Sequence, residues 1–562
     1  MIQQTRHITP HPTPPAPPNP PAPSGSGRAH VAVVGGGLAG LAAAAELLTL
    51  GFRVTLLEKN HHLGGKMNVL DEAGYRFDMG PTIITLPNVL RGILRRAGRD
   101  PAREIDLVDL DPQWRCFYPD GAALDLRKDL GEMCRALDDR FPGTDAGAGY
   151  RAFIEYSRRM FRLSENVFFY RDLGGIPDLM RDPPTRDPAV MRDVRAMRLH
   201  STVGATAHKH IKEPHLAQLV EHFLQYVGSS PFLAPAILSL IAAAQVDHGC
   251  WYPMGGTRQV ARALERLIRE HPFADVRTGA RVERFETSNG SVSAVLLEGG
   301  DRVDTDYVVS NCDVQRTYRD LAPSGDRGVE PEARSIAKRY EPACSGVVLY
   351  LGLDRQYDHL AHHNFLFSGS SKEEFGDIYR RGIPARDPTL YLAAPSRTDP
   401  DQAPPGGEAL YVLIHTAYKR AHQTWDGPGG LLEQYRPTVM NTLKTTGRMP
   451  DIEDRIVVEK HLTPDTIDRL YNAEGGAIYG LASHGRLHGG FKPRNSSRVY
   501  GNLFLAGGSA NPGPGVPMVL MSGVTAALSL ARRAGVDVEQ ARYHVRDEDA
   551  GSCATQAMGV GS

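Results

Sequence analysis

Near the start of the chain, the hydrophobic positions change from a strand pattern to a helix pattern and back. Residues 30–34 (HVAVV) form a short β-branched run that is typical of a buried parallel strand. Residues 41–50 are rich in Ala and Leu and are followed by Gly51, a common helix stop. Residues 53–57 alternate as a second strand, with Glu58 at its end. This pattern predicts a right-handed βαβ unit in an α/β fold.

The remaining pattern divides the chain into helical and β-rich blocks. Residues 88–245 have helical periodicity and few strand signals. Strand-like runs follow at 275–310, 345–353, 390–392 and 409–414. Residues 502–530 again predict a strand, a Gly-rich loop and a helix, like the opening unit. We therefore expect two sheet-containing domains that are interleaved along the chain.

The two ends differ from the body in composition. Residues 1–28 are mostly Pro, Ala and Ser and lack the apolar side chains of a core, which predicts a disordered tail. Residues 541–562 are polar and Gly-rich and predict a second loose tail. We expect no secretory signal, because no apolar run precedes a small-residue cleavage site. We also expect no spanning helix, because no stretch reaches roughly 18 apolar residues.

Charge and cysteine content narrow the function classes. The 562 residues include 64 Lys and Arg against 65 Asp and Glu, so no net positive field attracts nucleic acid, and we expect none as a partner. The six cysteines are scattered without a C-x-x-C pair, which indicates free thiols in a reducing compartment. No Cys and His set has metal-ligand spacing, so we predict no metal site.

The segment GGGLAG at 35–40 matches the G-x-G-x-x-G pattern of dinucleotide sites. Gly35 would form the tight turn, Gly37 would let backbone N–H groups approach a pyrophosphate, and Gly40 would let the helix pack on the strand. A Gly-rich turn without a ligand is the alternative. The preceding strand, the following helix and a ribose-binding acid favour the dinucleotide site, which is predicted to include Gly35, Gly37, Leu38, Ala39, Gly40 and Glu58.

Two further segments indicate a flavin rather than a nicotinamide. Soon after Glu58 come Lys59 and the Gly64–Gly65–Lys66 segment, which would bring a second backbone stretch and a basic side chain to the diphosphate. The turn Gly80–Pro81–Thr82 has little bulk and would lie against a flat ring.

The third segment lies near the C-terminal end of the body. Residues 502–518 (NLFLAGGSANPGPGVPM) predict a strand, glycines and a loop that enters a helix over 519–530. The helix N-terminus would face an electron-rich group, such as the N1/O2 edge of a flavin. A structural turn without a ligand is again the alternative. The predicted flavin contacts here are Gly507, Gly508, Val516, Pro517 and Met518.

Taken together, seven motifs resemble the bacterial FAD-dependent carotenoid desaturases of the phytoene desaturase type. They are VAVVGGGLAG with Glu58, GGKM, YRFDMGPT, GCWYPMGGTRQVARAL (249–264), VVSNCDV (308–314), GAIYGLASHG (476–485) and NLFLAGGSANPGPGVPM. The resemblance spans about 29–535. It implies a Rossmann-like FAD-binding domain of the amine-oxidase type, interleaved with a sheet-plus-helix substrate domain. The implied FAD domain comprises 29–87, 246–320 and 470–540, with a helical, membrane-facing insertion at 88–245 and a substrate domain at 321–469.

The resemblance also implies residue roles. Glu58 would bind the adenosine ribose, Lys66 would face the diphosphate, and Val282 would offer its backbone to adenine. FAD would be bound non-covalently, because no Cys or His occupies a flavinylation point in these motifs. The family often has Arg in place of Lys66. Arg can bind the diphosphate through two parallel hydrogen bonds, whereas Lys66 would act as a single point charge. No catalytic residue is named, because a flavin accepts the hydride and the protein positions the substrate.

The resemblance implies a function and leaves alternatives open. Residues 511–518 depart from the commonest phytoene desaturases and are similar to the branch that introduces the 3,4 double bond into hydroxylated acyclic carotenoids. We therefore expect 3,4-desaturation of a 1-hydroxycarotenoid in carotenoid biosynthesis, with oxygen or a quinone as electron acceptor. Phytoene or diapophytoene desaturation, carotenoid isomerisation and non-catalytic lipid carriage remain alternatives.

A histidine pair, an Asp–His pair and an aromatic segment among basic residues each allow more than one interpretation. His362 and His363 are adjacent, so in a strand they would point to opposite faces, and no third ligand lies at a suitable spacing; a structural role is therefore favoured over a metal or relay. Asp247–His248 fits an exposed loop pair better than an acid–base pair. Aromatic and aliphatic residues of 166–176, including Phe168, Phe169 and Ile176, lie among basic ones and suit a membrane surface, with an internal helix as the alternative. This predicts a cytoplasmic protein, peripherally associated with the inner face of the cell membrane.

Overall fold

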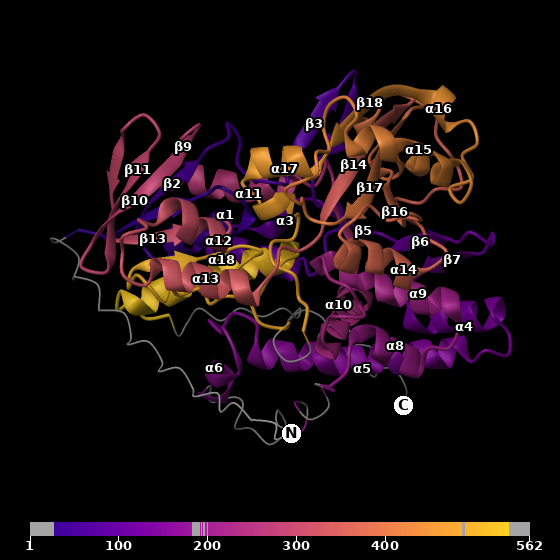
Figure 1. Cartoon of the computed structure of the whole chain (residues 1–562), viewed down its shortest axis with the longest axis horizontal. Helices are drawn as coiled ribbons and strands as arrows, with labels where there is room; N and C mark the ends of the chain where they lie inside the picture. Colours follow the sequence, from indigo (N-terminus) through magenta and orange to yellow (C-terminus); the bar gives the residue numbers. More distant parts are fainter. Residues whose placement is uncertain are drawn as a thin grey trace, which may run out of the picture.

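The computed structural model describes residues 27–181, 192, 194, 197–198, 200–485 and 489–538. Apart from residues 27 and 28, the predicted tails at 1–28 and 541–562 lie outside the described residues. One lobe of the molecule carries β1, β2, β9 and β13 with α1 and α18, and the other carries β14 to β18 with α15 (Figure 1). A row of helices that includes α5, α8, α9 and α10 lies along one side.

The first sheet has five parallel strands in the order β19-β13-β1-β2-β9. Its strands are β1 (His30–Val34), β2 (Arg53–Glu58), β9 (Ala274–Thr278), β13 (Tyr307–Ser310) and β19 (Leu503–Leu505). Every residue of β1 is buried, as its β-branched sequence predicts. Helices α1 (Leu38–Thr49) and α18 (Val516–Arg533) pack against each other and contribute to the core that covers the sheet. The predicted α/β fold with a Rossmann-like unit is confirmed.

The second large sheet has seven strands in the order β18-β14-β17-β16-β15-β6-β7. They are β6 (Trp114–Phe117), β7 (Ala123–Leu126), β14 (Ser345–Leu353), β15 (His363–Leu366), β16 (Leu390–Ala393), β17 (Glu408–Thr416) and β18 (Ile456–Leu462). The structure corrects one expectation here, because the segment 88–245 is not helical throughout. Its strand β6 pairs in parallel with β15, far along the chain, and four-residue strands carry little periodicity of their own.

Three small sheets complete the β-structure described. An antiparallel sheet joins β10 (Val282–Ser288), β11 (Ser291–Leu297) and β12 (Arg302–Asp304). Two two-stranded antiparallel sheets pair β3 (Val69–Glu72) with β4 (Tyr75–Asp78) and β5 (Leu107–Asp109) with β8 (Trp251–Pro253).

Helices fill the segments between the strands. From 88 to 248 they are α2 (Asn88–Arg96), α3 (Pro101–Glu104), α4 (Leu130–Arg140), α5 (Ala146–Val167), α6 (Ile176–Arg181), α8 (Val203–His210), α9 (Pro214–His222), η2 (Phe223–Val227), η3 (Ala236–Ser239) and α10 (Leu240–His248). Later come α11 (Gln259–Arg269), α12 (Val314–Arg316), η4 (Thr317–Leu321), α13 (Val329–Arg339), α14 (Ser371–Gly376), η5 (Asp377–Arg381), η6 (Pro395–Arg397), η7 (Pro400–Gln402), α15 (Leu431–Lys444), α16 (Ile452–Arg455), α17 (Pro464–Tyr471) and η8 (Glu474–Gly476). Among the described residues, none of these helices is both long and apolar enough to span a bilayer.

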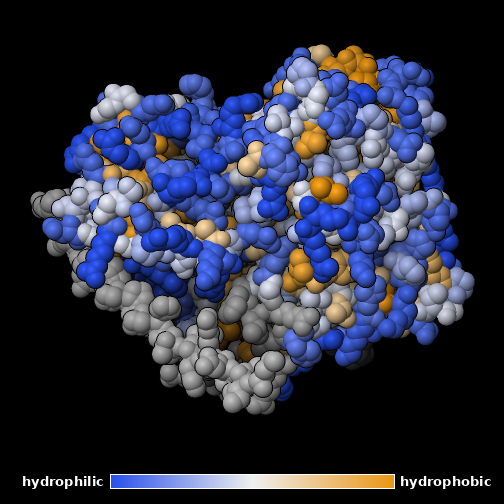
Figure 2. Space-filling model, viewed as in Figure 1, coloured by the Kyte–Doolittle hydropathy of each residue, from blue (hydrophilic) through white to orange (hydrophobic). Residues whose placement is uncertain are grey.

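The predicted membrane-facing patch at 166–176 is largely internal. Phe169 is buried, so its interpretation as a surface residue was wrong. Phe168 is half-buried, and its ring centroid lies 5.7 Å from that of Phe491. Their burial depends on contacts with residues distant in sequence, which the local pattern does not reveal. Ile176 is 40% exposed. On the face seen in Figure 2, apolar residues form separate small patches on a mostly polar surface.

Candidate functional site

A single cavity connects the two lobes and contains nearly all of the predicted site residues. Its empty space, including the part open to solvent, is about 3190 Å³. The predicted residues that line it are Gly35, Gly37, Leu38, Ala39, Glu58, Lys59, Gly64, Gly65, Lys66, Gly80, Pro81, Thr82, Val282, Gly507, Gly508, Val516, Pro517 and Met518. Segments more than 400 residues apart thus meet at one site.

The Gly-rich turn between β1 and α1 has the geometry that its sequence predicts. Gly35 has a φ of +97°, in the region that favours glycine. Gly37 is the N-cap residue of α1 and has no side chain to cap the helix. The Gly40 N–H donates to Asn311 Oδ1 at 3.1 Å, so the first-turn N–H groups that can face a ligand are those of Leu38 and Ala39, which line the cavity. Gly40 does not line the cavity. A Cβ there would lie 2.0 Å from the Gly35 carbonyl oxygen, so Gly40 permits the helix to pack on the turn.

Glu58 ends β2 beside this turn and is only 6% exposed. Its Oε2 accepts a hydrogen bond from the Gly36 N–H at 2.7 Å, and its Oε1 accepts one from the Asn60 N–H at 2.8 Å. The two backbone donors fix the carboxylate at the cavity wall, and its remaining lone pairs suit ribose hydroxyls. Val282, at the start of β10, lines the same wall.

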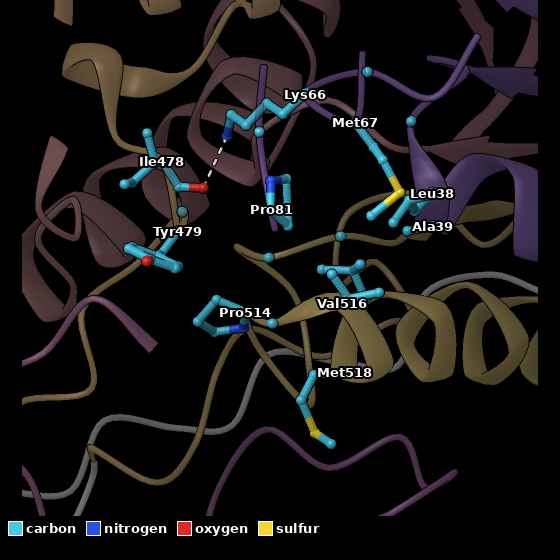
Figure 3. Close-up of a pocket in the computed structure, with 18 of the residues that line it drawn as sticks. Leu38, Ala39, Lys66, Met67, Pro81, Ile478, Tyr479, Pro514, Val516 and Met518 are labelled. Atoms are coloured by element: carbon cyan, nitrogen blue, oxygen red, sulfur yellow. Dashed lines mark hydrogen bonds between the residues drawn. The ribbon is translucent and has the colours of Figure 1, made fainter. Parts of the chain in front are cut away.

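Two predicted lysines have different environments. Lys59 donates to the Arg469 carbonyl and to Asn472 Oδ1, so its amino group is held by the protein. Lys66 is half-buried, and its Nζ donates to the carbonyl oxygens of Ala477 and Ile478, each at 3.1 Å; Figure 3 shows the bond to Ile478. Burial lowers the pKa of Lys66 to about 8, and the nearby Asp313 carboxylate partly opposes that shift. Its predicted contact with the diphosphate stays a prediction.

The remaining predicted segments form the walls around Lys66. A Cβ on Gly80 would lie 2.1 Å from the Lys66 carbonyl oxygen, so only glycine allows this approach. On the other side, α18 begins at Val516 behind Gly515, which has a φ of +106° and makes no side-chain cap. Pro514 and Val516 lie across the site from Lys66 and Pro81 (Figure 3).

The donor set fits a flavin dinucleotide. The wall offers uncapped N–H groups at the starts of α1 and α18 for a diphosphate and an electron-rich ring edge. It also offers the buried Glu58 carboxylate for a ribose and the half-buried Lys66 side chain. Small residues line the approach where a flat ring would lie.

Beyond these loops the cavity is aromatic, a feature that the sequence analysis missed. Its aromatic side chains come from both lobes and are Trp114, Phe168, Phe169, Tyr226, Phe365, Tyr391, Tyr411, Tyr471 and Tyr479. The Tyr391 hydroxyl is held between Thr82 Oγ1 at 2.6 Å and His363 Nδ1 at 2.8 Å. These rings come from eight separate elements and loops, so no sequence spacing relates them. Four of them, Trp114, Phe365, Tyr391 and Tyr411, lie on strands of the large sheet.

The histidine pair and the acid–base pair considered in the sequence make contacts within the protein. His362 and His363 are buried, and His362 Nδ1 lies 2.7 Å from Thr398 Oγ1. Asp247 accepts from Arg158 at 2.7 Å in an exposed ion pair. Within the described part of the chain, no cluster of three or more His, Cys, Asp and Glu side chains is placed to hold a metal ion.

The cysteines that the structure describes are all free thiols. Cys312 lines the cavity, and burial raises the pKa of its thiol to about 11. Glu58 is among the groups that raise this pKa, so the thiol is protonated beside the predicted ribose site. Cys553 lies outside the described residues.

Comparison with known proteins gives concordant results. The family model described as flavin containing amine oxidoreductase matches residues 38–530. The 4,4'-diaponeurosporene oxygenase of Staphylococcus haemolyticus is 35% identical, over 88% of this chain and 95% of that protein. The 4,4'-diapolycopene oxygenase of a Methylomonas species is 36% identical, over 88% of this chain and 96% of that protein.

Solved structures agree in fold. Putrescine oxidase with bound putrescine aligns with a TM-score of 0.59 at 14% identity, covering 90% of this chain and 99% of that one. A fatty acid isomerase from P. acnes aligns with a TM-score of 0.52 at 16% identity, covering 90% and 98%. At these identities the likeness concerns the fold alone.

Proposed function

Because the chain belongs to the flavin containing amine oxidoreductases and uses FAD, we propose that it oxidises an acyclic carotenoid in carotenoid biosynthesis. The relatives that match nearly the whole chain carry the names of oxygenases for 4,4'-diaponeurosporene and 4,4'-diapolycopene. The predicted relationship to FAD-dependent carotenoid enzymes agrees with these names. The observation that carries the proposal is the continuous cavity, in which the cofactor loops open into a chamber of aromatic side chains.

The reaction that we favour is oxygenation of a polyene of the diapolycopene class. Such a hydrocarbon has no polar group to anchor it, so it depends on apolar and aromatic contact, which this chamber supplies. The second candidate is 3,4-desaturation of a 1-hydroxycarotenoid. It is favoured by the sequence of 511–518, since Asn511, Pro512 and Pro514 of that loop line the cavity.

When bound, the flavin supplies the acceptor for the two electrons of a C–H oxidation. The chain's own contribution is to hold the polyene and exclude water from the reacting carbon. Among the described residues that line the cavity, only Glu58 and Asp313 are carboxylic acids, and neither belongs to the aromatic part. The histidines of that part are neutral, because burial lowers the pKa of His415 to about 3 and that of His222 well below its usual range. We therefore expect the protein to act mainly by positioning the polyene and not by supplying a strong general base.

The test uses purified holoprotein with 4,4'-diapolycopene, a 1-hydroxylated acyclic carotenoid or phytoene, in isotopically labelled water under air, because a C–H oxidation whose two electrons go to the flavin must take its oxygen from water. Products are separated by chromatography and weighed by mass spectrometry. Our proposal expects labelled oxygen in the diapolycopene product. Loss of two hydrogens from the hydroxylated substrate, without label, would replace it with 3,4-desaturation. New double bonds in phytoene would indicate a phytoene desaturase. A change of double-bond geometry alone would indicate an isomerase, and no change in any of the three compounds would indicate a carrier.

We also propose that the protein acts at the inner face of the cell membrane, with oxygen or a quinone as the electron acceptor. The substrate class supports this, since a long polyene dissolves in lipid and not in water. Because Phe169 is buried and Phe168 is half-buried, the contact would rest on exposed side chains such as Ile176 and the basic residues Lys209 and Lys212.

A further inference from the structure

Four polar side chains lie together in the aromatic part of the cavity. They are His222 at the end of α9, Gln225 in η2, His415 in β17, and Tyr479 in the loop after η8. The rings of His222 and His415 are 6.4 Å apart, and those of His415 and Tyr479 are 6.0 Å apart. His415 Nε2 lies 3.2 Å from the Tyr479 hydroxyl, so this pair satisfies itself.

The other two side chains keep free hydrogen-bonding atoms. His222 is 5% exposed and Gln225 is 3% exposed, yet among the described residues neither His222 Nε2 nor Gln225 Nε2 has a hydrogen-bond partner. The amide of Gln225 is oriented by its oxygen, which accepts from the Tyr379 hydroxyl at 3.3 Å. This orientation leaves the NH₂ group as an unused donor.

The described neighbours of the His222 ring include two phenylalanines, which offer it no hydrogen bond. Its ring meets Phe365 at 4.9 Å and Phe367 at 5.3 Å, both edge to face. Burial lowers its pKa well below the usual range, so the ring is neutral and has one donor and one acceptor nitrogen. Leaving such atoms unpaired in an apolar wall is unfavourable, which indicates that a ligand or a water completes them.

This polar group is adjacent to the predicted cofactor loops. Tyr479 directly follows Ile478, whose carbonyl accepts from Lys66. The next residue, Gly480, approaches Gly508 so closely that a Cβ on it would lie 2.6 Å from the Gly508 carbonyl carbon. An atom bound between His222, Gln225 and Tyr479 would therefore be close to the carbon that is oxidised.

We infer that His222 and Gln225, with His415 and Tyr479 beside them, form a subsite that hydrogen-bonds an oxygen atom carried by the polyene near its reacting carbon. The ligand class is a polyene alcohol or aldehyde. The inference rests on the proposed function and deepens it, because it assigns residues to the oxygenated form of the substrate. A bound water that serves no substrate is the competing explanation.

The test compares a 1-hydroxylated acyclic carotenoid with its parent hydrocarbon in wild-type holoprotein and in His222→Phe and Gln225→Leu. Turnover is followed by product chromatography, and binding by quenching of tryptophan fluorescence, since Trp114 lines the cavity. Each variant should lower the preference for the hydroxylated compound at least about tenfold, in binding and in turnover. His222→Gln, which keeps a hydrogen-bonding group, should restore part of that preference.

Phe365→Leu is the matched control, because it changes the same wall without removing a polar atom. It should affect both compounds alike. Equal effects of His222→Phe and Gln225→Leu on the two compounds would overturn the subsite and leave the bound water as the explanation. Wild-type protein that binds both compounds with the expected preference but converts neither would refute the proposed function and leave the subsite intact.

Discussion

Replacement of Glu58 by Gln tests the cofactor site most informatively. The carboxylate is 6% exposed, and each oxygen already accepts one backbone N–H, from Gly36 at 2.7 Å and from Asn60 at 2.8 Å. A ribose hydroxyl would therefore bind a spare lone pair of a charged acceptor. Hydrogen bonds to charged groups contribute about 1.5–3 kcal/mol and neutral ones about 0.5–1.5 kcal/mol. The loss of charge should cost about 1–1.5 kcal/mol, or roughly a tenfold weaker affinity for FAD.

The assay titrates apoprotein with FAD and follows the quenching of flavin fluorescence. Glu58→Ala should weaken binding further, by about 10- to 150-fold, because it removes the whole acceptor. Apoprotein stability is measured in parallel by urea unfolding, since both variants disturb the backbone donors of Gly36 and Asn60. Glu283→Gln, an exposed carboxylate in β10, is the control and should leave FAD affinity unchanged. If the Gln and Ala variants bind FAD as wild type does, the assignment of Glu58 is wrong.

Four further predictions follow from the structure. Gly40→Ala should lower the free energy of unfolding by about 1–3 kcal/mol, since its Cβ would meet the Gly35 carbonyl at 2.0 Å; an unchanged urea midpoint would refute this. The folded-state pKa of Lys66 is about 8, below its ordinary 10.5, so the unfolded chain holds more protons between these values. Raising the pH from about 8 to 10.5 should therefore raise the urea midpoint of wild-type apoprotein, and this increase should be absent in Lys66→Met. Acid precipitation should release yellow flavin into the supernatant, whereas colour in the pellet would mean a covalent link. Ile176→Ser should reduce co-sedimentation with anionic vesicles without changing FAD content, and equal sedimentation would exclude that contact.

The parts of the site that could be predicted are those in which one short segment defines its own geometry. The turn at Gly35 requires a positive φ, and Glu58 ends a strand next to that turn, so sequence spacing is enough to relate them. The same holds for Gly515, which starts α18 with a positive φ. Each of these features depends on backbone conformation within a few residues.

The parts that were missed depend on pairing between distant segments. Strand β6 meets β15 through Cys116 and Phe365, and neither four-residue run indicates a strand by itself. The basic residues around Phe168 predict a surface position, whereas its side chain is half-buried and packs against Phe491. His222 and Gln225 lie on short helical elements with ordinary neighbours. Their shared cavity becomes visible only when the sheet is assembled.

We propose that this protein oxidises an acyclic polyene by transferring electrons to its FAD. Anaerobic mixing of the holoprotein with 4,4'-diapolycopene or with the 1-hydroxylated carotenoid, while the visible absorbance of the flavin is recorded, tests this transfer. One of these compounds should bleach the flavin at least as fast as steady-state turnover, and air should restore the colour. A flavin that stays oxidised while the polyene binds or changes geometry would contradict it.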